Sequence, residues 1–138
     1  MTKTEILKFF NDNPICYLAT LEKNKPHVRA MRMYRADEKG IIFQTVDGKD
    51  LPKQLMENPN VEVCFYNLEK NLQIRVSGKA TLVEDDELKK EISEKRPFLK
   101  PWIVERGFNA IPVFRIVDCV AFTWTMETNL SPKQYVNL

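Results

Sequence analysis

The sequence predicts a mainly β domain with a few short helices, and six strands would suit a small antiparallel barrel that is closed or partly split. Two observations predict a single folded domain, and a third predicts its antiparallel sheet. The chain has 138 residues, the size of one domain. Its 43% hydrophobic and 29% charged residues are ordinary for a folded protein. Its apolar residues form short runs that polar turns separate, as in antiparallel sheets.

The N-terminal part predicts one helix and three strands. Thr2 or Thr4 can cap the helix, and apolar residues at helical spacing follow until Asn-Asp-Asn-Pro at 11–14 ends it. We expect a buried strand at 15–21, a strand with two distinct faces at 26–35, and a third strand at 41–45. Gly40 suits the left-handed turn that precedes the third strand.

The middle of the chain predicts a short helix at 49–58, which Pro59 ends. Alternating apolar residues then predict strands at 60–67 and 72–83, with Gly78 at a bulge.

A charged helix is expected at 84–95, with its outer face in solvent. Pairs of opposite charge lie four residues apart in it: Asp85–Lys89, Asp86–Lys90 and Glu91–Lys95. Residues 96–108 are ambiguous, with a short helix after Pro101. The last strand is predicted at 112–124, and the polar tail from Thr125 is expected to be irregular.

Several classes of protein are excluded by composition. A single histidine, His27, and three widely spaced cysteines (Cys16, Cys64 and Cys119) do not suit a metal site or a catalytic triad, and we expect the thiols to be small buried residues. The net charge of +2 is too even for non-specific nucleic-acid binding, and no run is long enough to span a membrane. With no secretory signal pattern, a cytoplasmic protein is expected.

Basic and hydroxyl side chains gather around the second and third predicted strands. Arg29 and Arg32 lie in mid-strand, where arginine is costly unless it meets an anion or a carboxylate. Thr45 ends the next strand and, after a glycine turn, Lys49 and Lys53 lie one helical turn apart. A strand end that is followed by a glycine turn and a helix N-terminus is a common phosphate-binding arrangement, because the backbone N–H groups and the helix dipole favour an anion. Alternatively, the lysines are solvated and Arg29 pairs with an acid; the residues leave both interpretations open.

The stretch 26–83 resembles the flavin-binding split barrels related to pyridoxamine-phosphate oxidase. The resemblance rests on four segments in order: P-x-V-R at 26–29, D-E-K-G-I-I-F-x-T at 37–45, Q-L-x-x-N-P-x-V at 54–61 and L-Q-x-R-V-x-G-K-A at 72–80. It implies one FMN-binding, six-stranded split barrel over residues 1–138. It further implies FMN as cofactor, a small-molecule substrate, and a homodimer that holds the flavin between two barrels.

The resemblance also implies roles for individual residues. Arg29 and the basic residues after the third strand are expected to hold the flavin phosphate, and the segment 30–33 to follow the ring. Gln73 is expected to reach the flavin of the partner subunit. Trp124 and Trp102 are candidates for stacking on the ring, although core or interface packing is the simpler role. The expected cofactor-binding residues are Arg29, Ala30, Met31, Arg32, Met33, Gln44, Thr45, Lys49, Lys53, Gln73 and Trp124.

Two departures from the oxidase pattern limit the expected activity. Lys49-Asp50-Leu51 stands where the oxidase has Ser-Arg-Lys, so one cation is lost. Residues 131–138 lack the Arg-x-His that grips the vitamin phosphate. We therefore expect a protein similar to the small, nitroimidazole-resistance-type branch rather than a vitamin B6 oxidase.

Three functional hypotheses follow. The first is an FMN-dependent oxidoreductase that passes electrons from reduced nicotinamide to a small acceptor, with no catalytic side chain identifiable. The second is a non-catalytic module that binds flavin or another phosphorylated ligand. The third is a related barrel that uses a deazaflavin or haem, for which His27 is the only imidazole.

Overall fold

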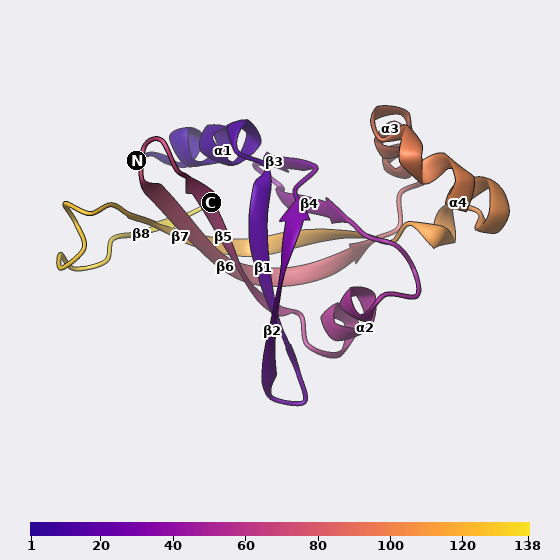
Figure 1. The fold of residues 1–138 in the computed structure, drawn as a ribbon, viewed down its shortest axis with the longest axis horizontal. Coiled ribbons are helices and arrows are strands. Elements are labelled where there is room, and N and C mark those ends of the chain that lie inside the picture. The colour runs from indigo at the N-terminus through magenta and orange to yellow at the C-terminus, as the bar shows by residue number, and fades with distance from the viewer.

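Eight strands form one antiparallel sheet, which curves into a split barrel with helices at its rim (Figure 1). The computed structural model describes all 138 residues. The strand order is β2-β1-β5-β6-β7-β4-β3, and β8 pairs with β7. The predicted class of mainly antiparallel split barrel is therefore confirmed. The strands are β1 Ile15–Glu22, β2 Lys25–Arg32, β3 Arg35–Asp37, β4 Gly40–Gln44, β5 Asn60–Asn67, β6 Leu72–Val83, β7 Val113–Trp124 and β8 Tyr135–Asn137.

Four α-helices and two short 3-10 helices complete the fold: α1 Lys3–Asp12, α2 Asp50–Glu57, α3 Asp86–Lys95, η1 Pro97–Leu99, α4 Lys100–Arg106 and η2 Phe108–Ala110. Thr2 caps α1, and Glu5 bonds back to the Thr2 backbone, which makes a capping box. In Figure 1, α3 and α4 lie together at one end of the molecule, and the β7–β8 loop projects from the opposite end.

The expectation of six strands is wrong, because two short strands lack a sequence signal. The predicted strand 26–35 changes partners near its end: the Met33 N–H bonds Pro14 O, whereas the Tyr34 N–H bonds Ile42 O. The chain thus leaves β1, and β3 pairs with β4. The tail is not wholly irregular either, since β8 pairs with β7 and places Tyr135 edge-on to Phe122, with 5.8 Å between the ring centroids.

The core consists of one large and one small apolar cluster. The large cluster joins the inner face of the sheet to α1 and α2, and it includes Phe10 and Phe65, whose stacked ring centroids are 4.1 Å apart. The small cluster joins β4 and β7 to the segment around α3 and includes Ile92. No helix combines the length and apolarity needed to cross a bilayer.

Two predicted features of individual elements need correction. β1 is buried on one face only, because it alternates between core and solvent. The expected ion pairs within α3 do not form. One reason is that the Lys89 side chain is buried and donates to Phe108 O over 3.0 Å. Another is that Glu91 accepts hydrogen bonds from Tyr34 and Arg35.

Two glycines allow strands to approach Ile116 of β7. A Cβ at Gly78 would lie 2.6 Å from Ile116 Cγ2, and the β6–β7 register shifts between Ser77 and Lys79. This confirms the predicted bulge. Gly40 has φ +137° and faces the Ile116 carbonyl, so a side chain there would be both strained and crowded. These contacts fix the position of β4, which ends at the groove described next.

Candidate flavin-binding groove

A groove of about 680 Å³ opens where the ends of β2 and β4 meet the segment that follows α3. We call it the basic groove. Its lining includes most of the sequence-predicted site: the segment 30–33, Gln44, Thr45 and Lys49. These residues come from two separate strands and the turn before α2, and the fold brings them together at one place. The volume lies within the range of small-molecule sites, about 300–1,000 Å³.

The basic groove has an uncompensated positive charge. Arg32, Lys49, Lys95 and Arg96 line it, and none of them lies within 4.0 Å of a carboxylate oxygen. No aspartate or glutamate is among the lining residues. Cations that line one groove without an acid repel one another, and a bound anion would reduce this repulsion. The lining of the groove is therefore electropositive and suits an anion.

Arg96 is the main site residue that sequence reasoning missed. It directly follows α3, and its guanidinium donates to Gln44 Oε1, to Arg32 O over 3.3 Å and to Met33 O over 3.0 Å. Partial burial lowers the pKa of Arg96, and the nearby Arg32 lowers it further. Arg96 therefore ties the segment after α3 to the end of β2. In the sequence, Arg96 is marked only by its neighbours Lys95 and Pro97. It also lies in the stretch 96–108, whose secondary structure the sequence leaves ambiguous.

Arg29 does not line the basic groove, and its side chain turns toward α2 instead. The guanidinium donates to Leu18 O over 3.2 Å, to Thr20 Oγ1 over 2.8 Å and to Gln54 Oε1 over 2.6 Å. All three acceptors are neutral, and no carboxylate oxygen lies within 4.0 Å. Partial burial lowers the pKa of Arg29, an effect that Asp50 opposes. The alternative of an acid-paired Arg29 is therefore wrong, and its cationic charge remains without an anion.

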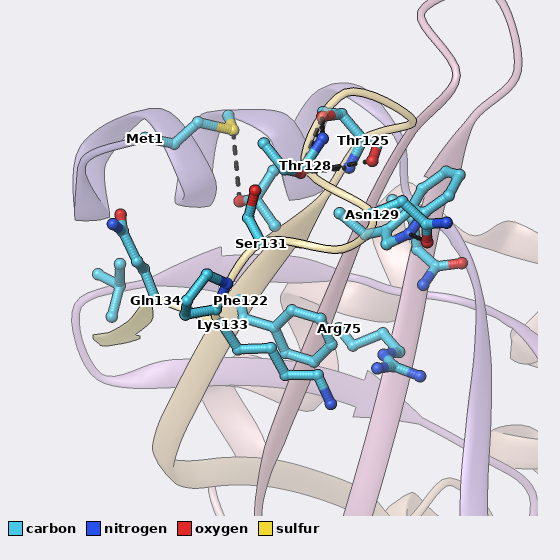
Figure 2. A pocket seen from close by; sticks show the side chains of 14 residues that line it. Met1, Arg75, Phe122, Thr125, Thr128, Asn129, Ser131, Lys133 and Gln134 are labelled. Carbon is cyan, nitrogen blue, oxygen red and sulfur yellow. Dashed lines mark hydrogen bonds between the residues drawn. The ribbon is translucent and has the colours of Figure 1, made fainter.

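Three other predicted residues lie outside the basic groove. Lys53 is exposed on α2. Gln73 and Trp124 are paired neighbours on β6 and β7, and they line a second groove of about 660 Å³ between these strands and residues 125–134 (Figure 2). Within the chain, the structure thus separates Gln73 and Trp124 from the residues that surround the end of β2.

Aromatic and sulfur side chains form the apolar part of the basic groove. Met33 is buried, whereas Met31 is partly exposed, and both line the groove. Phe98 and Trp102 line it from η1 and α4, with exposed fractions of 64% and 38%. Of the two tryptophans considered for stacking, Trp102 is the one beside this groove.

Tyr34 connects the basic groove to α3. Its hydroxyl donates to Glu91 Oε2 over 2.5 Å, and the Arg96 guanidinium lies 5.3 Å from its ring centroid. Partial burial, followed by the hydrogen bond to Glu91 and its charge, raises the pKa of Tyr34 to about 12. The phenol therefore keeps its proton and acts as a hydrogen-bond donor.

The remaining titratable candidates lie away from the groove. His27 is near the start of β2, half exposed, with Nε2 3.8 Å from Glu22 Oε2. Burial raises the pKa of Cys16 to about 12 and that of Cys119 to about 11, and it also raises the pKa of the half-buried Cys64. These thiols are therefore protonated, as expected of small buried residues.

Residues 2–109 match the family model described as pyridoxamine 5'-phosphate oxidase. The chain belongs to this family. Among curated relatives, the pyridoxine/pyridoxamine 5'-phosphate oxidase of Psychrobacter cryohalolentis is 36% identical over 63 residues, which are 46% of this chain and 29% of that protein. The enzyme of the same name from Burkholderia mallei is 34% identical over 71 residues, 51% of this chain and 33% of that protein. The matches span about a third of the length of these relatives.

Three solved structures share the fold of this chain over nearly its whole length. A NimC/NimA family protein of Clostridium acetobutylicum superposes with a TM-score of 0.78 at 23% identity, covering 98% of this chain and 92% of the other. General Stress Protein 26 of Bacillus anthracis gives 0.74 at 20% identity, with 99% and 98% covered. A pyridoxamine 5'-phosphate oxidase-related, FMN-binding protein of Nostoc punctiforme gives 0.64 at 16% identity, with 96% and 88% covered.

The Tyr34–Glu91 contact yields a pH-dependent prediction. Substituting Glu91→Gln removes the carboxylate charge, so the pKa of Tyr34 should fall from about 12 toward its ordinary value of 10.0 while partial burial keeps it above that value. Ultraviolet absorbance of tyrosinate during alkaline titration measures this change, and Tyr34→Phe identifies the signal among the four tyrosines. Because the folded-state pKa is the higher one, stability from this hydroxyl should decrease between pH 10 and 12. An unchanged midpoint in Glu91→Gln would contradict the assignment.

Proposed function

We propose that the protein is a homodimeric FMN-binding flavoprotein that transfers electrons from reduced nicotinamide to a small acceptor. The observation on which this depends is the basic groove, which combines four cations, no carboxylate and an apolar wall. Flavin mononucleotide needs the same combination: an anion site for its phosphate and a slot for its ring. The similarity to pyridoxine/pyridoxamine 5'-phosphate oxidases and to the FMN-binding protein of Nostoc punctiforme supports the same cofactor.

The residues present fit FMN at three points. Lys49 precedes α2, whose first N–H groups receive no side-chain cap and are available to a phosphate. β2 is an edge strand, so half of its backbone groups have no strand partner and can bond a ring edge. Gln44 accepts from Arg96 through Oε1, which leaves its amide N–H groups free to donate. Bound flavin would supply the hydride chemistry, and these groups would orient it.

The partner in this proposal is a second copy of the chain, packed on the exposed outer face of the sheet. We define the outer face by Ile15 and Tyr17 of β1, Val28 and Ala30 of β2, and Cys64 of β5. Ile15, Tyr17 and Val28 are 50%, 49% and 69% exposed. Large apolar side chains on a continuous surface are typical of a subunit interface. A copy on this face could bring Gln73 and Trp124 to the partner's flavin.

The FMN site is tested by comparing FMN with riboflavin, which lacks the phosphate. FMN should bind about 100-fold more tightly, because charge-assisted hydrogen bonds contribute about 1.5–3 kcal/mol. Substituting Lys49→Ala should weaken FMN binding about tenfold and leave riboflavin binding unchanged, since only the phosphate meets this cation. Quenching of flavin fluorescence measures both dissociation constants, with Lys70→Ala as an exposed control. Equal affinity for the two flavins would contradict the site.

Arg29 remains a predicted phosphate ligand, and its role has a separate test. Substituting Arg29→Ala should weaken FMN binding by about 2–5 kcal/mol if the guanidinium meets the phosphate. The matched variant Gln54→Ala removes a neutral partner of Arg29 but keeps the cation. It should lower the free energy of unfolding with little effect on FMN affinity. Equal losses of affinity in both variants would mean that Arg29 acts only by supporting α2.

The homodimer predicts that a charge on the outer face separates the subunits. Substituting Tyr17→Glu should convert the dimer to a monomer, because an unpaired carboxylate would be buried at the interface. Native mass spectrometry or light scattering measures the change. Val104→Glu is the control, since Val104 is 87% exposed on α4 and lies outside the outer face. A monomeric unaltered chain would contradict the proposal directly.

The second candidate is a binding module without turnover, which would use the cations and hydrogen-bond donors of the basic groove and needs no side chain that exchanges protons. Tyr34 is held protonated, and no thiol or imidazole lines the groove. Steady-state oxidation of reduced nicotinamide by the FMN-loaded protein separates the two candidates. Sustained oxidation in the presence of an acceptor supports the oxidoreductase, and a single stoichiometric reduction, or none, supports the module.

A further inference from the structure

An acidic residue, Asp50, lies among the cations that are expected to hold the flavin phosphate. It is the first residue of α2 and directly follows Lys49, which lines the basic groove. Asp50 is exposed, and no lysine or arginine nitrogen lies within 4.0 Å of its carboxylate oxygens. The carboxylate therefore neutralises none of these cations by direct contact.

The turns of α2 place Asp50 on the side of the helix that faces Arg29. Residues four apart lie on one face of a helix, so Asp50 shares a face with Gln54. The Gln54 side chain is buried, and its Oε1 accepts from the Arg29 guanidinium over 2.6 Å. The carboxylate charge acts on that guanidinium, because Asp50 opposes the lowering of the pKa of Arg29 by burial. Asp50 is thus close to both Lys49 and Arg29, the two cations expected at the phosphate.

A phosphate at this place would be repelled by Asp50 while it is attracted by the two cations. A phosphate monoester carries a charge of about −1.5 to −2 at pH 7, and Coulomb repulsion grows with the product of the two charges. Asp50 therefore opposes a doubly charged phosphate more than a singly charged one, and it does not repel a flavin that lacks the phosphate. In the empty protein the same carboxylate is favourable, because it interacts with the positive end of the α2 dipole. A bound phosphate would compete with it for that interaction.

We propose that Asp50 is a specificity-determining residue of the phosphate site, and that its carboxylate weakens the binding of a doubly charged phosphate relative to a singly charged one. Asp50 has this role only if the flavin phosphate lies at Lys49 and the start of α2, so the inference rests on the proposed function. The protein accordingly binds FMN less tightly than its cations alone would allow.

Substituting Asp50→Asn tests this role with three flavins that differ in the charge of the side chain. Riboflavin carries no phosphate, the cyclic phosphodiester of riboflavin carries one negative charge, and FMN carries up to two. The variant should bind FMN about fivefold more tightly and the cyclic phosphodiester about twofold more tightly, because the repulsion that is removed scales with the ligand charge. Its affinity for riboflavin should be unchanged, which also shows that the ring site is intact. Quenching of flavin fluorescence measures the three dissociation constants.

Glu57→Gln is the matched control, because it removes the same charge from the exposed C-terminal end of α2. Glu57 lies about 10 Å from Asp50 along the helix axis, and physiological salt screens exposed charges beyond about 8 Å, so all three affinities should stay unchanged.

The proposal is overturned if Asp50→Asn binds FMN no more tightly than the unaltered chain does. It is also overturned if the variant gains the same factor for riboflavin as for FMN, because Asp50 would then act on the ring site or on the fold. In both cases the unaltered chain still binds FMN, so the proposed function stands. If the unaltered chain binds none of the three flavins, the proposed function fails, and the role of Asp50 fails with it.

Discussion

The repulsion between Arg32 and Arg96, neither of which is paired with an acid, is the constraint on which the basic groove depends. Arg32 and Arg96 are close enough for one to lower the pKa of the other, and no acid in the lining relieves this. The fold tolerates the cost because other interactions hold the cations in place. Arg96 in particular is anchored by the carbonyls of Arg32 and Met33. A bound anion would reduce this repulsion.

The path of the chain at residues 32–35 explains why the groove forms there. Pairing with β1 ends at Arg32, and Tyr34 already bonds Ile42 of β4. The gap between the two halves of the barrel therefore opens beside the Met33 and Tyr34 backbone, and Arg96 crosses it from the segment after α3. Tyr34 supports the same junction through Glu91. The split in the barrel and the ligand groove are thus consequences of one change of strand partner.

Much of this could be predicted from the sequence, for reasons that differ between elements. Alternation of apolar residues predicts β5 and β6 because each has one face in the core. The segment 30–33 and Gln44 could be assigned to one site only through the resemblance to the split barrels, because β2 and β4 are not neighbours in the sheet. Thr45 and Lys49 could be placed together from the sequence, because one short turn joins them. Arg96 could not, because its position depends on how α3 and η1 pack on the barrel rather than on any local pattern. β3 and β8 were missed because three residues are too few to show a period of two.

The separation of the two grooves has a geometric cause. Residues paired across antiparallel strands lie on the same face of a sheet. The register therefore places one row across the outer face, in the order Ala30, Tyr17, Cys64, Arg75, Phe122 and Tyr135. Ala30 is in the basic groove and Arg75 is in the second groove, with the exposed Tyr17 between them. Two sites at opposite ends of this row cannot contact each other within one chain. A second copy packed antiparallel on the same row would place the basic groove of one chain beside the second groove of the other. Burial of Tyr17 in a dimer would therefore join an anion-binding groove to a polar one without any change in the fold of either subunit.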